Sequence, residues 1–291
     1  MSYLLLVIQQ LIASSTHLVA KSVTSIMHPA GVVLLRGAFT VTFYGMYYVL
    51  RRKARPKVQR ADWLLLLVLG IINLPINQLC FIWGIKYTTA PNAALAYALT
   101  PVFVVVFQAL HKRAWPVRKH LVGIGIAILG TAIVLSDGVS LDATHTLGNV
   151  MVLLASASWG LYTILGRRLV HTYGALYATA LTFFVGFAFY VPVWLLLPVH
   201  DTLTPLADPS VRSSVWTQLF YLGVVTSGVG YGLWYFALLR LESHRVAVFN
   251  NLQPIITTIL AFLVLGTVPS LLFFIGGCVA LVGVVVTQIQ E

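Results

Sequence analysis

The sequence predicts an all-α membrane protein with ten transmembrane helices, arranged as two inverted five-helix repeats around a central cavity. Of the 291 residues, 59% are hydrophobic and 9% are charged, which is too little polar surface to cover a water-soluble protein. Apolar stretches of roughly 17–25 residues, the length that crosses a bilayer, predict helices at about 3–20, 31–50, 63–85, 91–110, 119–136, 148–166, 174–197, 216–239, 245–265 and 271–289.

The two halves of the chain repeat one another without a gap. A constant offset superimposes Trp63 on Trp216, Pro101 on Pro254 and Gly130 on Gly283. We therefore predict two domains, at residues 1–136 and 147–291. Because each repeat contains five helices, an odd number, the second repeat enters the membrane from the side opposite to the first.

The distribution of charge predicts how the chain is oriented. A net charge of +11 would suggest a nucleic-acid partner in a soluble protein, but here the charge lies in turns between helices, so we predict none. Basic clusters follow the second, fourth, sixth and eighth predicted helices, starting at Arg51, Lys112, Arg167 and Arg240. The opposite turns hold Asp137, Asp142, Asp201 and Asp208. Since Lys and Arg concentrate on the cytoplasmic side of membrane proteins, both termini are predicted to be cytoplasmic.

Each repeat has a proline inside an apolar helix. Pro101 lies in ALTPVFVVVF and Pro254 in NLQPIITTIL. A proline removes a helical hydrogen bond and leaves backbone carbonyls free. Interrupted helices mark the substrate site in transporters built from repeats, so Pro101 and Pro254 are predicted hinges.

Polar and aromatic side chains inside the predicted helices are the candidate substrate-binding residues. Each has a structural alternative: amides hold helices together, aromatic rings fill the core, and a lysine or arginine reaches the membrane surface. On the first helix, Gln10, Ser14, His17 and Lys21 recur at helical spacing along one face. The candidates are His17, Arg36, Asn73, Asn77, Gln78, Tyr97, Trp159, Tyr162, Tyr231, Tyr235, Asn250, Asn251 and Gln253.

The chain resembles the EamA-type members of the drug/metabolite transporter superfamily along its whole length. The resemblance rests on the two proline-containing segments, the Gly-containing last helix of each half, Arg36, Lys21 and WGLYTILGRR at 159–168. It implies a basket-shaped bundle that moves solutes by alternating access in the cytoplasmic (inner) membrane of a bacterium. Two departures from the family are Ala13-Ser14, where relatives often carry Trp-Gly, and Thr267, where they carry Glu.

We therefore predict a secondary transporter or facilitator, working as an exporter, for small organic metabolites that are amino-acid-like or organic anions. The alternative is a metabolite channel or a lipid flippase. An enzyme is not expected, because the predicted helices contain no carboxylate and His17 as their one histidine. No cofactor or metal is predicted. The expected partners are the substrate and the lipid bilayer; the glycines of the last helices suit packing within a monomer or between subunits.

Overall fold

The computed structural model describes residues 2–51, 56–112, 118–136, 143–197, 203–266 and 268–288. Within these ranges the secondary structure is helical and contains no strand. Among the described residues, eight helices, some built from several segments, are long and apolar enough to cross a membrane, and two shorter apolar helices cover Leu121–Ile133 and Leu271–Val286. The predicted class, an all-α membrane protein, is confirmed. That the two shorter helices also cross the bilayer stays a prediction.

The first half of the chain is built from consecutive helical segments, of which η2 is a 3-10 turn and η3 is π-helical. They are α1 (Ser2–Ile26), α2 (Pro29–Leu50), η2 (Arg60–Asp62), α3 (Trp63–Ile71), η3 (Ile72–Gln78), α4 (Leu79–Tyr87), α5 (Ala90–Ala98), α6 (Thr100–Lys112) and α7 (Arg118–Ser136).

The second half contains another π-helical segment, η5, and 3-10 turns at η4 and η6. Its segments are α8 (Ala143–Tyr173), α9 (Ala175–Leu196), η4 (Thr204–Leu206), α10 (Pro209–Phe220), η5 (Tyr221–Gly230), α11 (Tyr231–Leu238), α12 (Ser243–Ala247), η6 (Val248–Asn251), α13 (Leu252–Leu265) and α14 (Leu271–Gln288). The prediction of 148–166 for α8 was too short, because the helix continues beyond its apolar run into polar residues at both ends.

Both proline-containing helices are interrupted just before the proline. The break between α5 and α6 falls at Leu99, two residues before Pro101, and the 3-10 segment η6 precedes Pro254. A proline ring collides with the carbonyl four residues earlier, and this disfavours a continuous α-helix there. Those earlier residues are Tyr97 and Asn250, which both belong to the candidate site.

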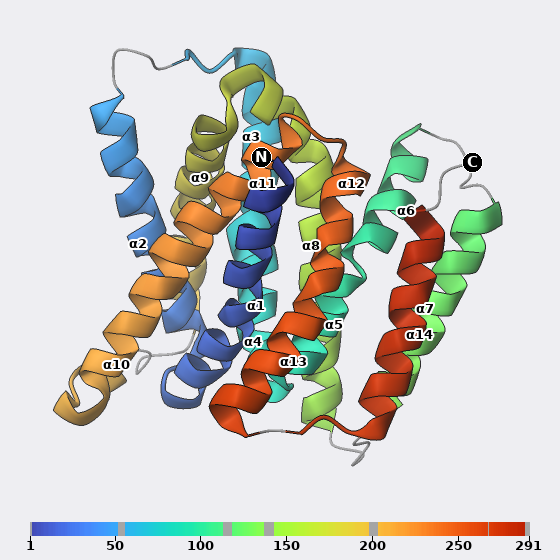
Figure 1. Cartoon of the computed structure of the whole chain (residues 1–291). Coiled ribbons are helices and arrows are strands. Elements are labelled where there is room, and N and C mark those ends of the chain that lie inside the picture. Colours follow the sequence, from blue (N-terminus) through green and yellow to red (C-terminus); the bar gives the residue numbers. More distant parts are fainter. Residues whose placement is uncertain are drawn as a thin grey trace.

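The chain runs up and down between two ends of the bundle (Figure 1). α1 begins and α14 ends at the same end, which we call the N-terminal end; the other is the opposite end. At the N-terminal end the Asp62 carboxylate, which is buried, binds Arg168 at 2.8 Å and accepts a hydrogen bond from the Tyr173 hydroxyl at 2.7 Å. This contact fixes the start of α3 to the end of α8.

α7 and α14 form a closely packed pair at one side of the bundle (Figure 1). A Cβ atom added to Gly130 would lie 2.2 Å from the backbone nitrogen of Ala280, and one added to Gly283 would lie 2.2 Å from that of Ala127. Gly130 and Gly283 are partners in the repeat, as are Ala127 and Ala280. Each helix therefore places a glycine against the backbone of the other, and neither glycine position has room for a Cβ atom.

Candidate functional site

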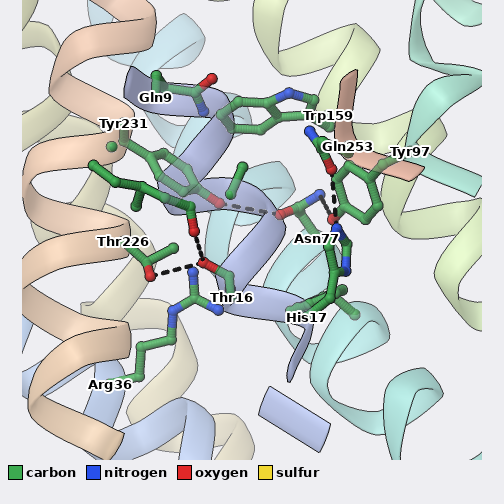
Figure 2. A pocket seen from close by; sticks show the side chains of 14 residues that line it. Gln9, Thr16, His17, Arg36, Asn77, Tyr97, Trp159, Thr226, Tyr231 and Gln253 are labelled. Carbon is green, nitrogen blue, oxygen red and sulfur yellow. Dashed lines mark hydrogen bonds between the residues drawn. The ribbon is translucent and has the colours of Figure 1, made fainter. Parts of the chain in front are cut away.

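A cavity in the middle of the bundle is the candidate substrate site (Figure 2). About 60 Å³ of it can be occupied by the centres of water molecules. That is room for about four waters. Both halves of the chain contribute to its lining, which consists of Gln9, Ile12, Ala13, Thr16, His17, Arg36, Asn77, Phe81, Tyr97, Trp159, Thr226, Gly230, Tyr231 and Gln253.

Two π-helical segments bring polar groups to this cavity. η3 contains Pro75 and supplies Asn77, while η5 supplies Thr226 and Gly230. A π turn holds one residue more than an α turn, so it changes the direction in which the following side chains point. The hydroxyls of Thr226 and Thr16 lie 2.9 Å apart and connect η5 to α1.

Arg36 is the charged group of the cavity. Its side chain is 2% exposed, its Nε donates to the Ser227 hydroxyl at 2.8 Å, and its Nη1 has no partner among the described residues. Figure 2 shows the guanidinium end of Arg36 pointing into the group of lining residues, toward Thr16. No carboxylate of the described residues forms an ion pair with it. An arginine stays charged inside a membrane protein and is costly there without an anion or water.

A chain of amides and an imidazole forms a second wall. The His17 Nε2 atom lies 2.9 Å from the Gln253 side-chain oxygen, and the Gln253 amide donates to Asn250 at 3.0 Å. Gln10 donates both to Asn250, at 3.1 Å, and to Gln9, at 2.7 Å. This chain connects α1 to η6 and α13, and Gln9, His17 and Gln253 are its members at the cavity.

Aromatic rings form a third wall, which comes from the second half of the chain. The Trp159 ring lies 4.7 Å from that of Tyr231 and 5.5 Å from that of Tyr162, measured between ring centroids. Tyr162 and Tyr235 stack behind this surface at 5.1 Å. Only Trp159 and Tyr231 of these rings line the cavity, so the other two support them.

Asn77 connects several helices at the cavity wall. Its amide nitrogen donates to the Ala155 carbonyl at 2.6 Å and lies 3.2 Å from the hydroxyls of Tyr97 and Ser158. Its oxygen accepts from the Tyr231 hydroxyl at 3.2 Å. Since these contacts use its donors and acceptor, Asn77 fixes the positions of the two tyrosines.

The structure divides the predicted site residues into two groups. His17, Arg36, Asn77, Tyr97, Trp159, Tyr231 and Gln253 line the cavity. The others lie outside the lining: Asn250 is fully buried behind Gln253, Asn73 and Gln78 are buried within η3, Asn251 is next to Asn250, and Tyr162 and Tyr235 are behind Trp159. A direct role in binding stays a prediction for all of them.

Part of the α1 lining differs from the predicted polar stripe. The cavity face of α1 carries Gln9, Ile12, Ala13 and Thr16. Gln10 and Ser14 of the predicted polar stripe lie outside the lining: the Gln10 side chain binds Asn250 in η6, and the Ser14 backbone carbonyl accepts a hydrogen bond from Thr257 in α13 at 3.2 Å. Both faces have helical spacing and lie side by side, so the pattern alone did not distinguish them. Phe81, Thr226 and Gly230 were also missed.

We expect Asn250→Ala to lower the yield of folded protein more than Gln253→Ala does. The Asn250 oxygen accepts hydrogen bonds from Gln10 and Gln253, so its removal leaves one N–H of each buried amide without an acceptor, at a cost of about 1–3 kcal/mol each. Gln253 borders the cavity, where water can replace its amide. Recovery from size-exclusion chromatography and melting in detergent measure the difference. Equal recovery of the two variants would contradict this assignment.

A multi-span helical fold around a cavity lined from both halves of the chain is the architecture of a membrane transporter. The sequence pattern of the EamA-like transporter family matches residues 1–136 and 146–289. The chain belongs to this family, and the resemblance to drug/metabolite transporters is confirmed. It is a transporter and not an enzyme.

Similar proteins carry transporter names. An uncharacterized transporter of Archaeoglobus fulgidus is 28% identical over 84% of this chain and 83% of its own. A probable terminal-alkyne amino-acid exporter of Streptantibioticus cattleyicolor is 29% identical over 79% of this chain and 74% of its own. A solved structure titled "Crystal structure of protein" shares the fold, with a TM-score of 0.66 and 18% identity over 98% of this chain and 95% of that one.

Proposed function

We propose that this transporter exports small carboxylate-bearing metabolites, in particular amino acids with an apolar or aromatic side chain, by alternating access. The observation that carries the proposal is Arg36: a buried guanidinium, without an anionic partner among the described residues, at the wall of the central cavity. The planar guanidinium matches a carboxylate with two parallel hydrogen bonds.

The other two walls support the rest of this substrate. The side-chain oxygens of Gln9 and Gln253 can accept hydrogen bonds from an ammonium group. The rings of Trp159 and Tyr231 offer an apolar surface, and they attract a cation as well. A small molecule with a carboxylate, an amine and an apolar part has a partner for each group.

The size of the cavity supports alternating access. Its room for about four waters is too small for an amino acid, so loading requires the surrounding helices to move. The interruptions at Leu99 and at η6 lie where helices can bend, and we propose Pro101 and Pro254 as hinges. Separate family matches to the two halves and the reciprocal α7–α14 contact support two inverted repeats, at 1–136 and 147–291, as the moving units.

Direction and orientation rest on charge and on one relative. Basic residues gather at the N-terminal end, which supports a cytoplasmic position for both termini in a bacterial inner membrane. The relative from S. cattleyicolor is named a probable terminal-alkyne amino-acid exporter, and this supports amino-acid export here.

A matched set of ligands tests the substrate class. Phenylalanine, 3-phenylpropionate and phenethylamine share one ring and differ in their charged groups. We expect phenylalanine and 3-phenylpropionate to raise the melting temperature of the purified protein and phenethylamine to leave it unchanged. Stabilisation by the amine alone would refute the proposal. Counterflow of labelled phenylalanine in proteoliposomes separates a carrier from a channel, which shows no counterflow.

We further expect transport without obligatory proton coupling. Proton-driven carriers relay protons through Asp, Glu or His inside the membrane. The described lining of the cavity contains no acid, and the Nε2 atom of His17 already bonds to Gln253. A pH gradient imposed on proteoliposomes should therefore not drive accumulation above the solute gradient. Accumulation that disappears in His17→Gln would overturn this prediction and make His17 the coupling residue.

A further inference from the structure

We infer that a second cavity, at the opposite end of the bundle, is an anion-binding vestibule that the carboxylate substrate occupies between the central cavity and the medium. The inference builds on the proposed function. This vestibule has room of about 380 Å³ for the centres of water molecules, which is more than the central cavity has. Its polar lining consists of Lys21, Thr89, Asn92, His145 and Ser270.

Lys21 gives the vestibule its charge. The side chain is half-buried, and its Nζ donates one hydrogen bond, to the backbone oxygen of Lys86 at 2.8 Å. An ammonium group can donate two more. No carboxylate is among the described residues that line the vestibule, and none forms an ion pair with Lys21.

The starts of three helices surround the same space. Thr89 caps α5 by accepting from the Asn92 backbone at 3.2 Å, and Ser270 caps α14 by accepting from the Phe273 backbone at 3.0 Å. His145 lies in the first turn of α8. Figure 1 shows α5, α8 and α14 all beginning at this end. Each helix start carries a partial positive charge, which adds to the charge of Lys21.

The vestibule lies close to the central cavity along shared helices. α1, α5 and α13 line both spaces; on α1, His17 borders the central cavity and Lys21 the vestibule. Four residues of α-helix span about 6 Å. The cluster of Leu18, Ala90 and Ala261 packs here, and two of its three side chains are methyl groups. A carboxylate passes here from Arg36 to Lys21 when the helices shift.

Charged thiol reagents test the vestibule without knowledge of the substrate. The native cysteines, Cys80 and Cys278, are first replaced by alanine. A cysteine at Ser270, which is exposed in the vestibule, is then modified with the anionic sulfonatoethyl or the cationic trimethylammonioethyl methanethiosulfonate at low ionic strength. Ser210→Cys, exposed on α10 at the same end, serves as the control site.

We expect the anionic reagent to be favoured at Ser270→Cys and this preference to fall severalfold in Lys21→Gln, because removing one nearby positive charge slows the anionic reagent and speeds the cationic one. Arg212→Gln removes a charge from α10 at the same end and should leave the ratio unchanged. Benzoate should slow the anionic reagent only while Lys21 is present. The ratio at Ser210→Cys should not respond to Lys21→Gln.

The inference is overturned if the anionic preference at Ser270→Cys persists in Lys21→Gln, or if the ratio at Ser210→Cys falls by as much in Lys21→Gln. This result is independent of the proposed function, because the measurement needs no transport and leaves Arg36 in place. If 3-phenylpropionate still stabilises the protein through Arg36, only the vestibule is refuted. If that stabilisation is absent while the reagent ratio depends on Lys21, the proposed function fails and the anion-attracting vestibule stands.

Discussion

Arg36→Gln should abolish stabilisation by 3-phenylpropionate while raising the melting temperature of the ligand-free protein. Loss of one partner of a buried charge pair costs about 2–5 kcal/mol in binding, which is about 30-fold to several thousand-fold in affinity. In the empty protein the buried guanidinium has one hydrogen bond at Nε and an unpaired Nη1. Replacing it with a neutral amide removes a cost of folding.

The opposite signs of these two effects distinguish binding from structure. Arg36→Lys keeps the charge but loses the two parallel hydrogen bonds, so we expect weakened binding and not full loss. Melting curves with and without ligand measure both quantities on the same sample. A lower melting temperature for Arg36→Gln with unchanged ligand stabilisation would show that Arg36 holds helices together through Ser227.

Gly130→Ala and Gly283→Ala should destabilise the protein by about 1–3 kcal/mol each, because forced overpacking costs this much. The added methyl group would lie 2.2 Å from a backbone nitrogen of the facing helix, so α7 and α14 must separate. Side-chain rotation cannot relieve a contact with a backbone atom. Thermal melting in detergent measures the loss.

The same two helices provide matched controls. A Cβ added to Gly125 on α7 or to Gly277 on α14 has no atom within 4 Å. Gly125→Ala and Gly277→Ala should therefore melt at or slightly above the temperature of the unchanged protein, since alanine favours a helix over glycine. If all four variants melted alike, the close contact between the helices would not contribute to stability.

Much of the architecture follows from the sequence alone. Long apolar runs with few charges can fold only as helices in a bilayer, because each backbone group must bond within its own segment. A polar or wet environment for Arg36 was predictable for the same reason, because a charge inside an apolar run requires a partner or water, and Arg36 does line the central cavity. Pro101 and Pro254 predicted the two interrupted helices, since a proline ring excludes the carbonyl of the preceding turn.

Only the tertiary structure decided which side chains face the cavity. The apolar pattern of α1 permits several rotations about its axis. Contacts of the Gln10 side chain with η6 and of the Ser14 carbonyl with α13 accompany the rotation that turns Gln9 and Thr16 toward the cavity. In the third predicted helix the π segment η3 brings Asn77, and not Asn73, to the lining. Helical spacing assumes a regular α-helix, so it cannot predict which residues share a face across a π turn. It also cannot distinguish an amide that lines the cavity from one, such as Asn250, that forms hydrogen bonds with neighbouring side chains.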